Sequence, residues 1–258
     1  MRADHRSEMR RFPNRCARRL IVRSSGRTYG RAVDYGSGVA EVTSVRVSAA
    51  GGWVKVVAED RGDVRVRGDA TLQHDGSTAT IEARPGRVEI RVPAGVDLVV
   101  GSDSGRVEVE GPLRVVAVVT ESGRITVEQA ASVDVRTSSG RVAIGRVEEG
   151  SRVRTNTGRV SVDETADADV ATVSGRIDLR SVSGRTTAHC VSGRIEIRLD
   201  AAADVEAETV SGRITIHVAD AVRFHSMTGP LPADSESHGA DCTIATRTVS
   251  GRVSITSR

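Results

Sequence analysis

Arginine recurs at a fixed position directly behind a glycine, and this spacing is the clearest chemical signal in the sequence. The residues concerned are Arg106, Arg124, Arg141, Arg159, Arg176, Arg194 and Arg213, with Arg252 after an interruption. If the repeats stack at the spacing of neighbouring β-strands, about 5 Å, the guanidinium groups form a column that phosphates or carboxylates would stabilise. The column is therefore a candidate binding surface for a polyanion, either a nucleic acid or an acidic polysaccharide.

The alternative for the same arginines is a solvated face at a bend of the chain. Salt would screen the charges, and Glu108, Asp178 and Glu196, each two positions further on, would neutralise part of them. The column also lacks aromatic side chains that could stack on bases or sugars, which weighs against recognition of nucleic acids or glycans. Both interpretations stay open on the sequence alone.

Residues that could support catalysis or bind a metal are present, but their spacing fits neither role. His189 and Cys190 are neighbours in a predicted strand and so face opposite sides, which prevents them from acting as a base and a nucleophile and places Cys190 in the core. The carboxylates are scattered over Asp97, Asp103, Glu121, Asp134 and Asp178, and the remaining groups, His217, His225, His238 and Cys242, match no metal motif. We expect no enzyme, no catalytic residue, no metal and no cofactor, with a carbohydrate-active enzyme on a β-helix as the enzymatic alternative.

A repeat of about 18 residues must position these side chains. Its corner glycines are Gly105, Gly123, Gly140, Gly158, Gly175, Gly193, Gly212, Gly229 and Gly251, at intervals of 18, 17, 18, 17, 18, 19, 17 and 22 residues. Such a period is too short for a two-helix repeat and fits one turn of a stacked β-coil. Every residue that precedes one of these glycines is serine or threonine.

Apolar residues alternate on both sides of each glycine, as in the pair Val107 and Val109 after Gly105. The alternation slips by one residue at the glycine, which indicates a bend or bulge with a positive φ angle. Threonine and serine recur three residues before the glycine and would form ladders of hydroxyl groups. We predict an all-β fold, a single-stranded parallel β-helix or solenoid with coils of about 17–19 residues and an N-terminal β cap.

Charge and composition divide the chain into three parts. Residues 1–34 are predicted to be a disordered basic tail, because residues 1–31 hold ten arginines against only Asp4 and Glu8. Residues 35–96 are predicted to form the β-rich cap, with strands near 42–47, 53–58, 64–67, 78–83 and 87–92 and with Trp53 in its core, and residues 97–258 to form the solenoid repeats. An aromatic content of 2% excludes a conventional thick core.

The repeats resemble a bacterial β-strand-repeat family of unknown function that carries a provisional adhesin label. The resemblance covers roughly residues 40–258 and rests on the recurring Ser-Gly-Arg corner and on the lead-in from Val88 to Leu98. It implies a β-solenoid, in actinobacteria frequently without an export signal, and it brings no established activity, cofactor or catalytic residue. Family members often have aspartate or a small polar residue after the glycine, which argues against a universal role for the arginine.

These observations favour a non-enzymatic interaction or scaffold module, adhesin-like, over the polyanion-binding protein and the enzyme. Its partner would be an unidentified protein, a second copy of the chain or a polyanion. No apolar run is long enough for a transmembrane segment and no secretion signal is visible, so we expect a cytoplasmic location, with cell-surface association as the alternative.

Overall fold

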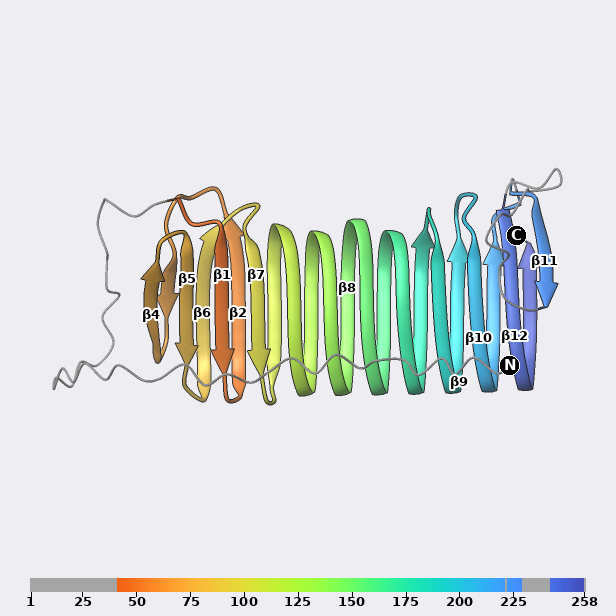
Figure 1. Ribbon diagram of the computed structural model, residues 1–258, viewed down its shortest axis with the longest axis horizontal. Coiled ribbons are helices and arrows are strands. Elements are labelled where there is room, and N and C mark those ends of the chain that lie inside the picture. Colours follow the sequence, from red (N-terminus) through yellow and green to blue (C-terminus); the bar gives the residue numbers. More distant parts are fainter. Residues whose placement is uncertain (1–40, 221, 229–241, 258) are drawn as a thin grey trace, which may run out of the picture. The chain divides into compact units, whose positions relative to one another are not determined.

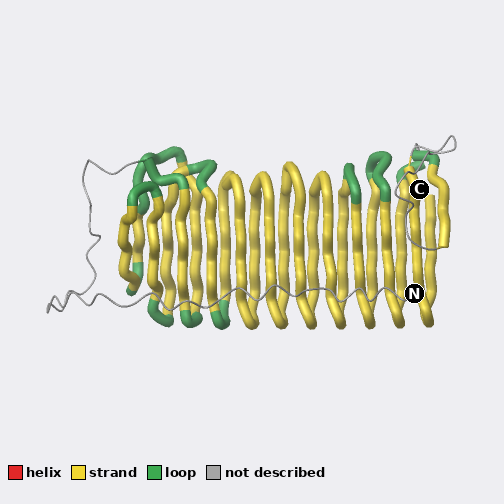
Figure 2. The backbone as a smooth tube through the Cα atoms, viewed as in Figure 1, coloured by secondary structure: helices red, strands yellow, loops and turns green. Residues whose placement is uncertain are grey.

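The computed structural model describes residues 41–220, 222–228 and 242–257 (Figure 1). In this part of the chain all regular structure is β-strand and there is no helix (Figure 2). The strands are β1 (Ser44–Ala49), β2 (Gly52–Glu59), β3 (Arg65–Arg67), β4 (Ala70–Asp75), β5 (Thr78–Ala83), β6 (Gly86–Pro93), β7 (Asp97–Ser102), β8 (Arg106–Val182), β9 (Thr186–Leu199), β10 (Val205–Val218), β11 (Phe224–Thr228) and β12 (Cys242–Ser257). The all-β prediction is confirmed, whereas the coil length and the N-terminal cap stay predictions.

The strands pair in parallel and bring equivalent positions of the repeat into register. In β9, Ser192 lies opposite Ser174 of β8 and opposite Ser211 of β10. The same register runs from β10 to β12, where Gly212 lies opposite Gly251. The chain therefore winds as stacked coils, as the ribbon of Figure 1 shows. The register of the pairing turns each column of the repeat into a row along the stack.

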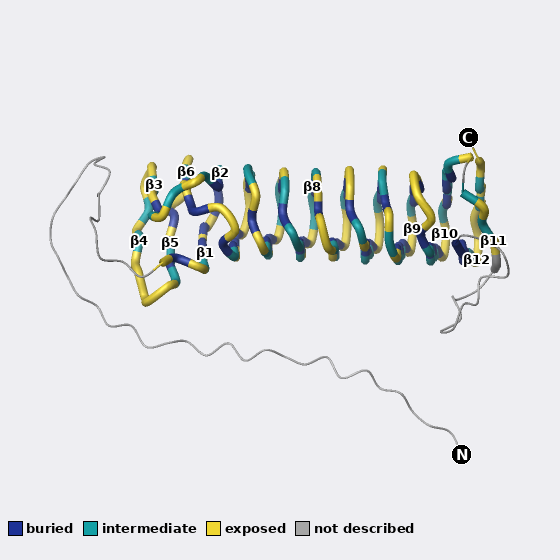
Figure 3. Tube along the Cα trace, turned by 90° about the horizontal axis from the view of Figure 1, so that it is seen from above, coloured by how far each residue is buried: buried dark blue, intermediate teal, exposed yellow. Residues whose placement is uncertain are grey.

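Branched aliphatic side chains fill the interior of the coils. The largest fully buried side chains are isoleucine and leucine, for example Ile195 and Ile197 of β9 and Ile214 and Ile216 of β10. Buried and exposed positions alternate along the trace in Figure 3, because successive strand residues point to opposite sides. The buried column three residues before each corner glycine consists mostly of threonine, as at Thr137 and Thr155.

The coils near the N-terminus do not stack in the order of the sequence. β2 pairs with β6 on one side and with the start of β8 on the other, and β1 lies in the same way between β5 and β7. The first coil of the chain is thus inserted between the second and the third. Beyond the second coil, β3 and β4 pair antiparallel with β6 and β5.

The C-terminal coils are interchanged in the same way. β12 pairs with β10 on one side and with β11 on the other, so β11 lies at the end of the stack. The sequence repeat aligns Phe224 with Thr246, but in the structure Phe224 lies opposite Cys242. The expectation that the stretch before Gly229 repeats the standard register is therefore wrong, because β11 is shifted by four residues along its neighbour.

Two sequence predictions cannot be compared with the structure. Residues 1–34, the predicted tail, and Gly229 lie outside the described residues. The boundary between the cap and the repeats stays a prediction, although the five predicted N-terminal strands correspond to β1, β2, β3, β5 and β6.

Candidate anion-binding site

The corner glycines lie directly on top of one another and leave no room for a side chain. A Cβ atom built on Gly158 would lie 2.0 Å from the carbonyl oxygen of Gly140, and one on Gly140 would lie 2.0 Å from that of Gly123. The φ angle of Gly158 is +145°, in the region that favours glycine. Glycine is therefore required by close stacking and by backbone conformation together, as the slip in the alternation predicted.

The buried hydroxyl column fixes the shape of each corner. Thr137 donates a hydrogen bond of 3.0 Å to the carbonyl oxygen of Ser139, two residues further along and directly before the glycine. Equivalent bonds from Ser102, Thr120, Thr155 and Thr172 measure 3.0, 3.1, 3.2 and 3.4 Å. Because these bonds span only two residues, they fix the shape of each corner within its own coil, in addition to the backbone bonds between coils such as that from Arg124 N–H to the carbonyl oxygen of Gly105.

The arginine column is a straight row on the outside of these corners. Arg194 lies opposite Arg176 and Arg213, and Arg213 lies opposite Arg252. The stacked glycines carry the same register through β8, which brings the remaining predicted arginines into the row, namely Arg106, Arg124, Arg141 and Arg159. All seven predicted residues therefore share one row; five of them are exposed, and Arg176 and Arg194 are half-buried. We call Arg106, Arg124, Arg141, Arg159, Arg176, Arg194, Arg213 and Arg252 the arginine row.

Trp53 continues the row beyond Arg106, which the sequence did not reveal. It lies opposite both Arg106 and Arg87, because β2 is inserted between β6 and β8. The Arg87 guanidinium carbon lies 3.8 Å from the centre of the indole ring and that of Arg106 lies 5.4 Å away. The placement of Trp53 in the core of a cap is thus wrong, and so is the absence of aromatic residues from this face. The sequence did hold a signal for this placement. Val54 and Val56 follow Gly52 by two and four residues, which are the offsets of the apolar residues after each corner glycine.

Most of the row has no intramolecular counter-charge. Arg106 forms an ion pair of 2.8 Å with Glu108. Glu196, in contrast, pairs with Arg198 at 3.3 Å rather than with its row neighbour, and Asp178 makes no ion pair among the described residues. Within the same residues no ion pair or side-chain hydrogen bond involves the seven arginines from 124 onward. The expected neutralisation by carboxylates two positions on therefore holds at Arg106 alone.

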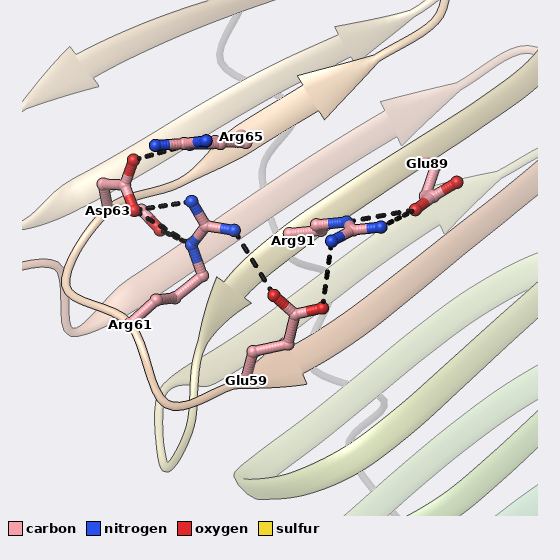
Figure 4. Close-up of polar contacts among 6 residues, drawn as sticks. All are labelled: Glu59, Arg61, Asp63, Arg65, Glu89 and Arg91. Atoms are coloured by element: carbon pink, nitrogen blue, oxygen red, sulfur yellow. Dashed lines mark hydrogen bonds and ion pairs between the residues drawn. The ribbon is translucent and has the colours of Figure 1, made fainter. Parts of the chain in front are cut away.

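Arginines elsewhere in the molecule do find carboxylates. At the N-terminal end, Arg61 lies 2.7 Å from Asp63, and this hydrogen bond lowers the pKa of the Asp63 carboxyl group. The surrounding network, drawn in Figure 4, joins Glu59, Arg61, Asp63, Arg65, Glu89 and Arg91. Several arginines outside the row are therefore neutralised by carboxylates, whereas within the row only Arg106 is.

The four C-terminal coils of the row form an open groove of about 690 Å³. It is lined by Gly175, Arg176, Gly193, Arg194, Gly212, Arg213, Gly251 and Arg252. On the other side of the same corners runs a row of exposed valines, Val173, Val191, Val210 and Val249. The corresponding positions in the coils of Gly105 and Gly123 are Asp103 and Glu121. In the column two residues before the glycine, acidic side chains therefore occur near Trp53, whereas valines occupy the same column along the groove.

The residues considered for catalysis are not gathered by the fold. Cys190 is buried in the threonine column, as predicted, and burial raises the pKa of its thiol. His189 points away from it, and its Nδ1 lies 3.2 Å from Glu208. Among the described residues no group of three or more His, Cys, Asp or Glu side chains could hold a metal ion; His238 lies outside them. The part of the chain that the structure describes also holds no helix that could cross a membrane.

Comparison with known proteins gives a family and several structural neighbours, among them the two described below. The profile of the family described as Toastrack DUF4097 matches residues 43–256. A candidate adhesin from Bacteroides fragilis NCTC 9343 is 12% identical, with a TM-score of 0.43 over 91% of this chain and 98% of that one. A candidate cell adhesion protein from Clostridium sporogenes ATCC 15579 is 8% identical, with a TM-score of 0.22 over 85% and 94%. The comparison with curated proteins gave no match.

Proposed function

The chain belongs to the Toastrack DUF4097 family, and we propose that it is a non-enzymatic, adhesin-like binding module whose arginine row holds an extended polyanion. The proposal takes the stack as a single-stranded parallel β-solenoid with coils of about 17–19 residues and a β-rich N-terminal cap. Its partner and its location in the cell stay predictions.

One observation carries the proposal: the arginines of the row from Arg124 onward stand in register and form no ion pair with a carboxylate among the described residues. Two unit charges about 5 Å apart repel each other by about 1 kcal/mol even in bulk water. A chain of phosphates or carboxylates along the row would turn this repulsion into attraction and release its own counterions. A rigid row stabilises such a ligand because the arginine backbones are already fixed before binding.

The chemistry of the row favours recognition of charge over recognition of sequence. The indole ring of Trp53 already lies 3.8 Å from the guanidinium carbon of Arg87 and 5.4 Å from that of Arg106, so these cations compete with a base or a sugar for it. The guanidinium groups can bind phosphate or carboxylate oxygens in pairs. We therefore assign the row to polyanions as a class.

The test compares two triple variants of the full chain that lose the same charge. The first variant changes Arg124, Arg141 and Arg159 to serine. The control changes Arg114, Arg146 and Arg180 to serine; in the parent chain these arginines pair with Asp97, Glu164 and Asp163, respectively. The probe is a labelled oligothymidylate, with polygalacturonate as competitor, and affinity is measured at several salt concentrations.

We expect the first variant to bind more weakly and its salt slope to fall by about 2, since about 0.7 counterions are released per contact on a single strand. The control should keep the affinity and slope of the parent chain to within about twofold. Equal losses in both variants would mean that binding follows net charge and would refute the assignment to the row.

A further inference from the structure

The last coil of the stack leaves half of its outer edge open. β12 pairs with β10 from Ile244 to its last residue, Ser257. On its other side, β11 pairs only with the first five residues of β12, from Cys242 to Thr246. Among the described residues no strand covers residues 247–257 on this side, so the outward-facing backbone N–H and C=O groups there lack a strand partner.

The opposite end of the stack is covered over both halves of its coil. β4 pairs antiparallel with all six residues of β5, and β3 pairs with the central residues of β6. β3 is only three residues long, and two of these are arginines, Arg65 and Arg67. Short, charged strands of this kind discourage further strand addition.

The open strand has none of these protective features. Between Thr248 and Ser257 the only charged residue is Arg252, and there is no proline. Val249 is 77% exposed, against about half for the other valines of its row. Val253 and Ile255 are only partly buried, whereas their equivalents in the preceding coil, Ile214 and Ile216, are completely buried. A long, nearly uncharged edge that leaves apolar side chains partly exposed is a template for pairing with another strand.

We propose that residues 248–257 form a self-association edge, at which two copies of the chain pair antiparallel about a two-fold axis. Two identical edge strands related by a two-fold axis can pair only in the antiparallel sense. A two-fold contact uses the same edge on both copies, so it closes on itself and gives a dimer rather than a fibre. The pairing completes the open ladder and buries Val253 and Ile255. It goes beyond the proposed function and does not depend on the arginine row.

The test uses two double variants of the full chain that place lysines in the same two columns of the repeat. The edge variant carries Val249→Lys and Ser254→Lys; the control carries Val210→Lys and Thr215→Lys, one coil further in, where β12 already occupies the edge. Sedimentation velocity from about 1 to about 100 µM reports the association state, over a range in which a specific dimer is populated. Thermal unfolding checks that both variants fold.

We expect a dimer for the parent and for the control, and dimerisation at least about tenfold weaker for the edge variant. Hydrogen exchange gives a second readout, because the amides of β12 after Thr248 should be protected more strongly as the concentration rises. A parent chain that stays monomeric at the highest concentration overturns the proposal. So does a dimer in which the edge variant associates as well as the control, or in which these amides show no added protection.

Discussion

At the scale of single residues, the corner glycines determine where the arginines lie. Each corner glycine from Gly123 to Gly193 stacks on the carbonyl group of the corner glycine one coil earlier. The residue after it lies on the outside of the coil. The hydroxyl group three residues earlier bonds to the carbonyl that precedes the glycine. The straightness of the arginine row thus depends on the corner glycines and on the buried hydroxyl groups as well as on the arginines themselves.

Replacing a stacked glycine should therefore be costly. Gly158→Ala would place a methyl group 2.0 Å from the carbonyl oxygen of Gly140 and would hold alanine at a φ angle of +145°. We expect a loss of about 2 kcal/mol or more in the free energy of unfolding, measured with urea. Gly62→Ala is the control, because nothing lies within 4 Å of its added Cβ and its backbone needs no positive φ. A loss at Gly158 no larger than the control's would show that the stack relaxes easily.

The spacing of the repeat was sufficient to predict the arginine row, because a fixed offset from a stacked glycine becomes a straight line. Trp53 could not be assigned to it in the same way. The corner at Gly52 has neither the serine before the glycine nor the arginine after it, and only its valines follow the repeat. Pairing of the charges was also out of reach, since Glu196 could bond to Arg194 or to Arg198 equally well by sequence.

At the scale of elements, neighbouring coils are joined by backbone ladders and by a few ion pairs between outward side chains. Arg152 and Arg154 both reach Asp169 on the next coil, and Arg154 also donates to its carbonyl oxygen at 2.9 Å. Burial alone would raise the pKa of Asp169, but the hydrogen bonds and charges of the two arginines outweigh it and hold that pKa below its ordinary value. This carboxylate therefore stabilises the contact between two coils while it is ionised.

Asp169→Asn should weaken that contact in a pH-dependent way. Because the pKa is lower in the folded than in the unfolded state, the contribution is complete above the ordinary value of about 4 and is lost as the pH falls through the folded value. We expect a destabilisation of about 1 kcal/mol at pH 7, discounted for partial exposure, that shrinks below about pH 4. Urea unfolding at a series of pH values measures it. Asp163→Asn, which breaks an exposed pair with Arg180, should cost less at pH 7; an equal cost would contradict the role of Asp169.

The order of the coils was the part of the element arrangement that the sequence could not supply. Consecutive elements usually lie side by side, yet β1 and β2 lie between later strands at one end and β12 lies between earlier ones at the other. Every coil offers the same apolar columns, so the pattern fits several stacking orders equally well. The register of β11 could not be predicted either, because this strand has only five residues and contains no corner glycine that could align it with its neighbour.

At the scale of the whole molecule, a stack of coils has an interior and two ends, and the stability of a coil depends on how many neighbours it has. Ile197 of β9 is completely buried between two coils, whereas Ile255, in the same column of the repeat, is covered on one side only. We expect Ile197→Ala to cost about 3 kcal/mol of unfolding free energy and Ile255→Ala about 1 kcal/mol. Urea unfolding at low protein concentration, where the chain is monomeric, measures both.

The same pair of variants reports on the end of the stack when the concentration is raised. If two copies pair through β12, Ile255 gains a second neighbour, and the cost of Ile255→Ala should rise with concentration while that of Ile197→Ala stays constant. Equal costs at low concentration would mean that the last coil is packed as tightly as the interior ones. The open edge would then lack the exposed apolar surface that makes pairing favourable, so the difference between these two isoleucines connects the architecture of the stack directly to its ability to associate.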